Sequence, residues 1–175
     1  FNPDIVLDIN YDFMNKLRNN RNATITPFKN EKLKLIIDED GRTVKFSLKH
    51  NIDNSRIEIV APLNNKSGYV SFKYKGRYLT FQETCCYLYF TTKPPKDDDN
   101  MVHYKFNDSA SFISLNTPIS KNGYNSFGVI KTKNDKEKLY YLKIRSSFNS
   151  NRKLFYKEVM DYEVKFRIKK SADPA

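Results

Sequence analysis

Apolar and polar residues alternate with a period of two along most of this sequence. Successive side chains of a strand lie on opposite faces of a sheet, so such alternation predicts strands with one buried and one wet face. About nine or ten short strands, joined by turns, are typical of an all-β, mostly antiparallel β-sandwich. The alternation is clear in 33–37, 44–48, 70–74, 102–106 and 162–169. Further short strands are expected at 57–59, 78–81, 112–115, 127–131 and 139–144.

One further run, 85–92, is apolar at consecutive positions rather than at alternate ones. A strand with two apolar faces is typical of the interior of a sheet, so we expect this segment to be central. Turn chemistry bounds several runs: Gly41, Gly76 and Gly123 each supply the positive φ that tight hairpins require.

Two segments are candidate helices. Asn10 is a favoured N-cap residue, and Phe13, Met14 and Leu17 follow it at helical spacing, which predicts one short helix. The segment 150–161 fits either a helix or a strand. No linker or repeat interrupts the pattern, which predicts a single domain over 1–170. The small polar tail that follows, 171–175, is expected to be disordered or a remnant of cloning.

The aromatic content makes a packed core feasible in a chain of low hydropathy. The 175 residues include 13 Phe and 12 Tyr but no Trp, and the mean hydropathy is −0.71. Disordered chains lack aromatic residues, and no stretch approaches the roughly 18 consecutive apolar residues of a membrane span. The composition therefore argues against a disordered chain and against a membrane-spanning helix.

The chain is basic, with 31 Lys and Arg against 20 Asp and Glu and a net charge of +11. Such a balance points to nucleic acid, an anionic surface or an acidic partner. However, Lys outnumbers Arg, and Asn, Tyr, Phe and Ile are also frequent, as AT-rich genomes favour. Nucleic-acid sites usually favour Arg, so the composition argues against nucleic acid as the partner.

The sequence contains no catalytic or metal-binding motif. Only His50 and His103 are available as bases near neutral pH, and both fit ordinary strand positions. The acidic run 97–99 lacks the alternate spacing and the closing Glu of a calcium loop. The adjacent Cys85 and Cys86 are poorly placed to form an ordinary disulfide with each other. We therefore expect a non-enzymatic protein with no cofactor and no bound metal.

Three sequons and the first residue bear on the compartment. Asn22, Asn65 and Asn107 each begin an Asn-X-Ser/Thr motif and are candidate glycosylation sites. The chain starts at Phe1 rather than at Met, which indicates a removed leader or trimming. Together these features favour a secreted or cell-surface location.

A β-trefoil is the alternative architecture. The segments 68–72 and 76–79 together resemble one lobe of such a fold. Second and third copies of the pattern are missing, so the trefoil stays an alternative to the sandwich. A trefoil would favour a secreted or surface ligand or adhesin.

Five short blocks carry a resemblance to a known family: DIVLDI (4–9), KLKLI (32–36), VKF (44–46), FISLN (112–116) and ISK (119–121). In order and spacing they resemble the poxvirus host-range family of short β-sandwich proteins. The resemblance implies a non-enzymatic antagonist that binds interferon-induced host factors in the host cytoplasm. It also implies a functional loop at 49–54, where Asp53 matches an acidic position and Asn54 replaces the family's tryptophan. The segment 122–170 has no counterpart there.

These observations predict a viral or parasite protein that binds a host protein and so modulates or evades host immunity. We expect a monomer or a weak dimer. The alternatives are the trefoil-like ligand or adhesin and a basic nucleic-acid-binding β module. The candidate partner-binding residues are Asp53, Asn54, Arg56, Tyr69, Tyr74, Arg77 and Tyr78.

Overall fold

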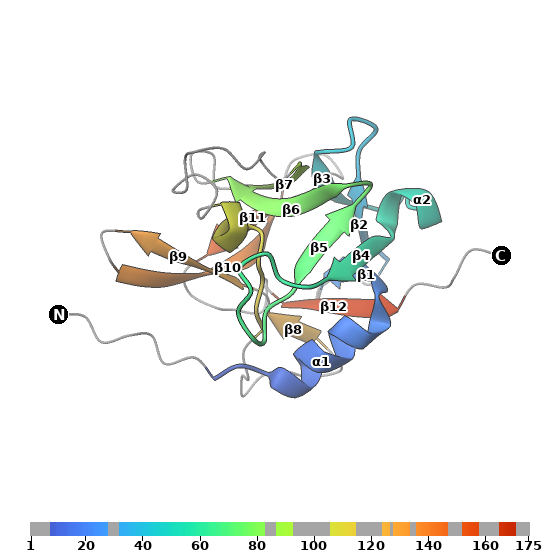
Figure 1. Ribbon diagram of the computed structural model, residues 1–175. Coiled ribbons are helices and arrows are strands. Elements are labelled where there is room, and N and C mark those ends of the chain that lie inside the picture. Colours follow the sequence, from blue (N-terminus) through green and yellow to red (C-terminus); the bar gives the residue numbers. More distant parts are fainter. Residues whose placement is uncertain are drawn as a thin grey trace.

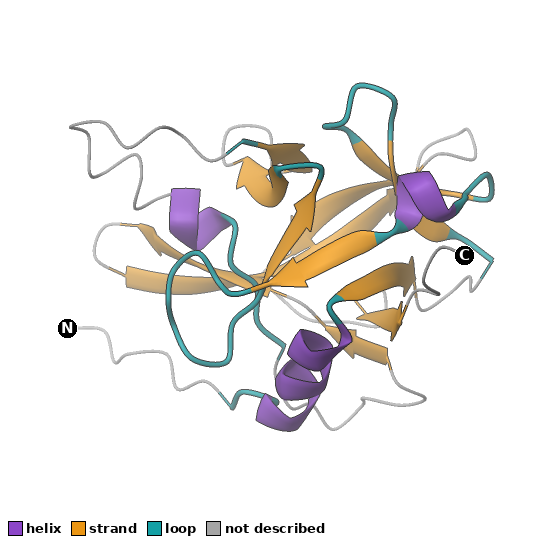
Figure 2. Cartoon of the chain, turned by 45° about the vertical axis from the view of Figure 1, so that its right-hand side comes forward, coloured by secondary structure: helices purple, strands orange, loops and turns teal. Residues whose placement is uncertain are grey.

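The protein is built mainly from antiparallel strands, with few and short helices (Figures 1 and 2). The computed structural model describes residues 8–27, 32–82, 87–92, 106–114, 124–126, 128–133, 136–146, 152–157 and 165–170. The helices are α1 (Tyr11–Asn20) and α2 (Ile52–Ser55), with a further helical turn at 106–109. The strands are β1 (Asn22–Pro27), β2 (Lys34–Ile37), β3 (Val44–Ser47), β4 (Ile57–Val60), β5 (Ser71–Tyr74), β6 (Arg77–Gln82), β7 (Tyr87–Thr91), β8 (Tyr124–Ser126), β9 (Gly128–Lys133), β10 (Lys136–Ser146), β11 (Arg152–Lys157) and β12 (Lys165–Lys170).

Hydrogen bonds join the twelve described strands into one continuous sheet. The strand order is β2-β3-β11-β7-β6-β5-β4-β1-β12-β8, and β10 pairs with both β11 and β9. Some strands pair with the next strand in the sequence, as β2 does with β3 and β5 with β6. Other pairs join strands that are far apart in the sequence, such as β1 and β12. Strands near the two ends of the described chain are therefore paired in one sheet.

The core is aromatic at its centre, as the Phe and Tyr content predicts. Phe46, Phe72, Phe90 and Phe112 are all fully buried. The rings of Phe72 and Phe112 lie 5.4 Å apart at 50°, a tilted arrangement that aromatic pairs favour. Aliphatic side chains from β2, β3, β4 and β6 complete this cluster.

Helix α1 covers one side of the sheet, and its start is the one predicted from the sequence. Asn10 is the N-cap, and its Oδ1 accepts a hydrogen bond of 3.1 Å from the backbone N–H of Phe13. Met14 and Leu17, one helical turn apart, are each 1% exposed and belong to the core cluster. No helix among the described residues is long and apolar enough to cross a membrane.

Most predicted strands are present, and the segment 150–161 resolves to its strand alternative, because 152–157 form β11. The all-β, mostly antiparallel fold class is confirmed. Three elements were not predicted: β1, α2 and β8. Leu48 was expected on the buried face of its strand, but β3 ends at Ser47 and Leu48 is 58% exposed.

The segment 102–106 differs from its prediction where it can be compared, because Phe106 begins a helical turn rather than ending a strand. The described part of the predicted strand 112–115, residues 112–114, forms no named strand, and Phe112 makes an isolated bridge with Val70. Several predictions concern positions outside the described residues: Cys85, Cys86, the acidic run 97–99, His103, the Gly123 turn and the tail 171–175.

Candidate functional site

Three segments that are far apart in the sequence meet at one groove. They are the β2–β3 turn, helix α2 with its N-cap, and the β5–β6 turn, all toward the upper right of Figure 1. The groove has a volume of about 680 Å³. Its lining residues are Ile36, Ile37, Asp38, Glu39, Asp40, Gly41, Asn51, Asp53, Asn54, Tyr74, Lys75 and Arg77.

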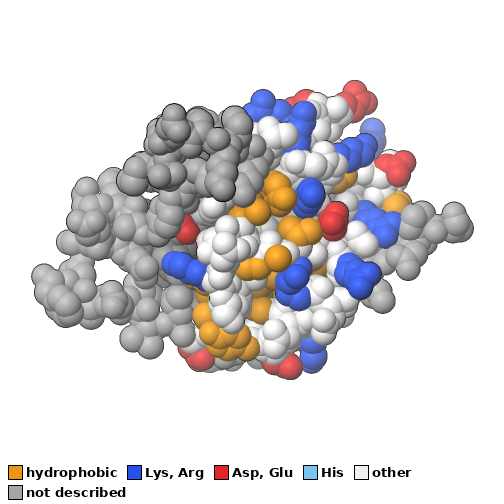
Figure 3. Space-filling model, in the orientation of Figure 1, with side chains coloured by type: hydrophobic (Ala, Val, Ile, Leu, Met, Phe, Trp, Pro, Cys, Tyr) orange, Lys and Arg blue, Asp and Glu red, His pale blue; other side chains and the backbone are white. Residues whose placement is uncertain are grey.

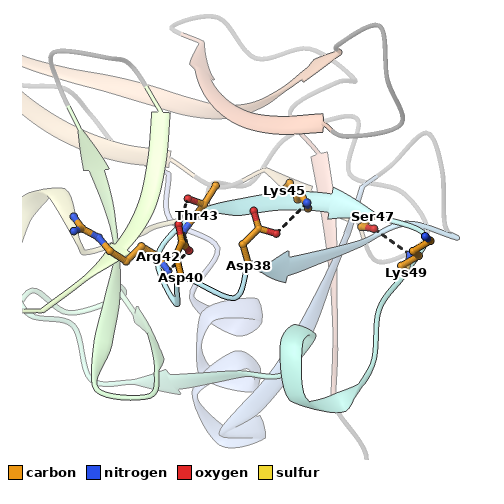
Figure 4. Close-up of polar contacts among 7 residues, drawn as sticks. All are labelled: Asp38, Asp40, Arg42, Thr43, Lys45, Ser47 and Lys49. Atoms are coloured by element: carbon orange, nitrogen blue, oxygen red, sulfur yellow. Dashed lines mark hydrogen bonds and ion pairs between the residues drawn. The ribbon is translucent and has the colours of Figure 1, made fainter.

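The β2–β3 turn is held by the carboxylate of Asp40 (Figure 4). Its Oδ1 accepts hydrogen bonds from the backbone N–H groups of Arg42 (2.8 Å) and Thr43 (2.9 Å), and its Oδ2 accepts one from the Thr43 hydroxyl (2.6 Å). The Thr43 hydroxyl, with these two N–H groups, lowers the pKa of Asp40 from 3.8 to about 2. Asp40 is thus a structural carboxylate that stays ionised at physiological pH.

Arg77 connects the two turns across the groove. Its Nη1 donates a hydrogen bond of 2.9 Å to the backbone oxygen of Asp40. Gly41 makes this approach feasible, because a Cβ at that position would lie 2.7 Å from Arg77 Nη1. Gly41 also has φ +70°, which non-glycine residues adopt only with strain. One side of the groove is therefore held in place by an arginine and a glycine.

Helix α2 is a single turn closed by a reciprocal capping box. The backbone N–H of Asn54 donates to Asn51 Oδ1, and the backbone N–H of Asn51 donates to Asn54 Oδ1, both at 2.8 Å. The hydroxyl of Tyr74 donates to the backbone oxygen of Asp53 at 2.7 Å and so ties α2 to β5. These bonds use the amide oxygens of both asparagines and leave their Nδ2 groups without a partner among the described residues.

The carboxylates of the groove fall into two kinds. Asp38 lies 3.0 Å from the ammonium of Lys45, and Asp40 is bonded within its turn. In contrast, the side chains of Glu39 and Asp53 are exposed and have no hydrogen-bond or ion-pair partner among the described residues. These two carboxylates and the Nδ2 groups of the two asparagines are lining groups that have no hydrogen-bond partner among the described residues.

The aromatic component of the groove is Tyr74, which is half-buried. Its ring lies 5.9 Å from that of Phe90, and the ammonium of Lys75 lies 5.3 Å from its centroid. Its hydroxyl is bonded to α2 as described above. The ring is thereby fixed by the core on one side and by α2 at its tip.

The structure brings four of the seven predicted partner-binding residues to this groove: Asp53, Asn54, Tyr74 and Arg77. The other three do not line it. The ammonium of Lys73 lies 5.5 Å from the centroid of the Tyr78 ring. Arg56 is the C-cap of α2. Tyr69 was expected to be an exposed aromatic, but it is buried, with 6% exposure.

Sequence reasoning missed the β2–β3 side of the groove: Asp38, Glu39, Asp40 and Gly41. This acidic turn was recognised only as a hairpin connection. Its place beside α2 depends on the long-range bond from Arg77 to Asp40. Neither residue carries a local signal for that contact, so only the folded chain brings the two turns together.

The three sequons differ in their surroundings. Asn65 is exposed in a loop, with φ +58°, and is the most open of the three. Asn22 begins β1 and pairs with Glu58 of β4. Asn107 lies in the helical turn at 106–109, and its Oδ1 is buried. Among the described residues, no group of His, Cys, Asp and Glu could hold a metal ion.

No protein-family model matches the sequence, and neither does any curated protein sequence. Solved structures do match. SeviL bound to asialo-GM1 saccharide has a TM-score of 0.58 and 12% identity over 86% of this chain and 98% of its own. The designed 3-fold symmetric protein ThreeFoil has a TM-score of 0.58 and 10% identity over 85% and 97%.

An endo-β-galactosidase from Clostridium perfringens, described as releasing GlcNAcα1-4Gal, also matches, with a TM-score of 0.58 and 16% identity. The match covers 86% of this chain but 32% of that enzyme, so this chain spans about a third of its length. These similarities concern the fold alone, and they include β-trefoil proteins. They agree with the all-β class and with the trefoil alternative, whereas the resemblance to the poxvirus host-range family stays a prediction.

Proposed function

We propose that this protein is a non-enzymatic binding protein whose groove takes a neutral saccharide. The observation that carries the proposal is the set of polar groups without a partner among the described residues. They are the carboxylates of Glu39 and Asp53 and the Nδ2 groups of Asn51 and Asn54, next to the ring of Tyr74.

This combination suits the surface of a sugar. Sugar hydroxyls both donate and accept hydrogen bonds, so carboxylates can accept from them while amide nitrogens donate to them. A pyranose also has an apolar C–H face, which an aromatic ring can cover. A concave site with few, well-placed polar groups is the usual form of a small-ligand site.

Charge favours a neutral rather than an acidic sugar. The groove is lined by four carboxylates, those of Asp38, Glu39, Asp40 and Asp53, against the cations of Lys75 and Arg77. Arg77 already donates to the backbone of Asp40, and Lys75 lies over the Tyr74 ring. A sialic acid or sulfate would therefore meet an excess of negative charge, which opposes its binding.

The same residues favour binding over hydrolysis. Glycosidases usually need one carboxyl group that is protonated near neutral pH and a second that is ionised. The pKa of Asp40 is lowered to about 2, which is the wrong direction for a general acid. The carboxylate of Asp38 is already engaged by the ammonium of Lys45, 3.0 Å away.

The comparisons support the proposal through the fold. SeviL was solved bound to the asialo-GM1 saccharide, and it shares this fold over nearly its whole length. For this chain, we propose that the ligand is carried by a host glycoprotein or glycolipid. The hypothesis that the chain acts on the host immune system stays a prediction.

The test is binding of neutral oligosaccharides, the asialo-GM1 saccharide included, to the wild-type chain and to Asp53→Ala by calorimetry. Loss of a hydrogen bond to a charged group is expected to weaken binding by about tenfold or more. Glu58→Ala is the matched control, because Glu58 is an exposed carboxylate of β4 outside the groove. Equal weakening in both variants, or a preference for sialylated sugars, would contradict the proposal.

A further inference from the structure

The basic charge of the chain is concentrated in its last third. Residues 115–175 hold 14 of the 31 Lys and Arg and 6 of the 20 Asp and Glu, so their net charge is +8. The net charge of residues 1–114 is only +3. In Figure 3, the Lys and Arg side chains of the described residues lie apart from one another, between polar and hydrophobic ones. The described residues on that face form no continuous basic patch.

The register of the β9–β10 ladder places four lysines together. Lys131 is directly opposite Lys138, and Lys133 is directly opposite Lys136. Residues opposite each other in an antiparallel ladder share a face, as do residues two apart in one strand. We name these four positions the lysine block. They lie on one face, about 5 Å apart across the strands and about 7 Å apart along them.

No acidic residue shares this face of the ladder. The remaining positions on it are Val129 and Tyr140, which are opposite each other. Glu137, the acidic residue of β10, is opposite Thr132 on the other face, together with the apolar pair Leu139 and Ile130. Like charges at directly opposite positions destabilise a ladder, and here two such pairs are adjacent.

Protection of a sheet edge does not explain this arrangement. β9 is paired only with β10 among the described strands, and lysines on an edge strand oppose aggregation. An acidic residue opposite each lysine would protect the edge equally well and would also form an attractive pair. The chain instead places lysine opposite lysine twice.

We propose that the lysine block binds a sulfated polysaccharide. A linear polyanion presents several negative groups at short intervals, which matches a compact block of four cations better than a single small anion does. The paired positions on this face of the ladder include no arginine, the residue whose planar fork recognises phosphate in two-bonded geometry. The one aromatic residue on the same face, Tyr140, is opposite Val129, whereas single-stranded nucleic acid is usually held on several stacked aromatics.

This site is distinct from the groove. Figures 1 and 2 both draw the β9–β10 ladder and α2 on opposite sides of the molecule. The inference therefore does not depend on the proposed saccharide function. Loss of neutral-sugar binding in Asp53→Ala is expected to leave polyanion binding unchanged.

The test uses heparin as the sulfated probe, with uncharged dextran as the negative ligand and single-stranded DNA as the competing polyanion. The variant replaces Lys131, Lys133, Lys136 and Lys138 by Gln. We expect heparin affinity to fall roughly 100-fold at low salt, since each neutralised contact removes counterion release.

A control variant removes the same number of positive charges from the β10–β11 ladder. It replaces Lys143, Arg145, Lys153 and Lys157 by Gln. Register places these residues on the other face of β10, because Arg145 is opposite Lys153 and Tyr141 is opposite Lys157. Heparin binding that survives in this control and is lost in the first variant supports the proposal. Equal losses in both, or none in either, overturn it.

Tighter binding of DNA than of heparin, with the same dependence on the four lysines, would overturn the assignment to a sulfated polysaccharide. Thermal unfolding checks that each variant is folded. Lys138→Glu serves as a second variant, because it reverses one charge and puts an attractive pair in place of a repulsive one. It is expected to lose most heparin affinity while the chain stays folded, and unchanged affinity would again overturn the proposal.

Discussion

The groove and the lysine block differ in how their charges are partnered. In the groove, Asp38 lies 3.0 Å from Lys45, and Asp40 accepts three hydrogen bonds inside its own turn. In the lysine block, Lys131 and Lys133 are opposite Lys138 and Lys136, with no acidic residue on that face of the ladder. Two of the four carboxylates of the groove thus have partners within the fold. In contrast, the strand register places each lysine of the block opposite another lysine.

This difference shows that the net charge of a chain is a poor guide to any one site. A value of +11 suggests an anionic ligand for the whole protein. The groove is nevertheless lined by more carboxylates than cations, and it suits an uncharged ligand. The two regions should therefore respond differently to salt, to local strain, to pH and to single charge reversals.

Salt should separate the two regions most strongly. Heparin binding through four lysines should weaken roughly 100-fold between about 50 and 200 mM salt, because bound counterions are released. Binding of a neutral sugar in the groove should change little, because no counterions are released there. Isothermal titration of both ligands at several salt concentrations measures the two slopes. If the affinities for heparin and for the neutral sugar depended equally steeply on salt, the two regions would not differ in the way proposed.

Local strain should affect only the groove. Gly41→Ala is expected to destabilise the chain by about 2 kcal/mol, because φ is +70° and the new Cβ would meet Arg77 Nη1 at 2.7 Å. Gly76→Ala is the matched control, since Gly76 has φ +79° and open space around its Cβ position. Denaturant unfolding of both measures the difference. If both cost the same, the contact with Arg77 contributes nothing to the stability of the groove.

The pH dependence of stability should report on the β2–β3 turn. The pKa of Asp40 is lowered to about 2 in the folded chain, so its contribution is fully present above its ordinary value of 3.8. It is lost as the pH falls through about 2. Because Asp40 is exposed, solvent screening limits that contribution to about 1 kcal/mol.

Asp40→Asn should therefore lower stability at neutral pH and flatten the acid limb of the stability curve. Glu39→Gln, in the same turn but without a partner among the described residues, is the control and should leave both unchanged. Acid titrations of stability by circular dichroism make the comparison. An acid limb that persists in Asp40→Asn would show that other carboxyl groups cause it.

The fold could be predicted further from the sequence than the site could. Alternation of apolar and polar residues is a local signal, and it located β2, β3, β5 and β6 as well as the Asn10 cap. β1 was missed although Ala23 and Ile25 alternate with polar residues, because the run is short and the intervening threonines are buried as well, so polarity does not mark its buried positions. α2 is a single turn whose capping box consists of two asparagines, Asn51 and Asn54, and asparagine is too frequent in this chain to mark a helix start.

The sites depend on contacts that no local pattern contains. Four groove residues were singled out as loop residues with polar or aromatic chemistry, but the acidic turn opposite them was not. Of the lysine block, only Lys131 lies within a predicted strand, because the predicted runs are 127–131 and 139–144 and the other three lysines fall between them. The pairing of Lys131 with Lys138 also depends on a register that the sequence pattern alone leaves open. In both regions the types of residue can be read from the sequence, but which of them lie close together in space cannot.

A single charge reversal in the lysine block should change the stability of the chain least, and it should raise that stability rather than lower it. Lys138→Glu replaces a repulsive pair with Lys131 by an attractive one, so the chain should become more stable by roughly 0.2–1 kcal/mol at low salt. Most surface substitutions are neutral or destabilising, so a gain here is informative. Glu137→Lys, the same kind of reversal on the other face and opposite Thr132, should bring no such gain.

Thermal unfolding at low and high salt measures the stability of both variants. A gain that vanishes at high salt identifies like-charge repulsion as its cause, whereas a loss of stability in Lys138→Glu would mean that the four lysines do not repel one another in the folded chain.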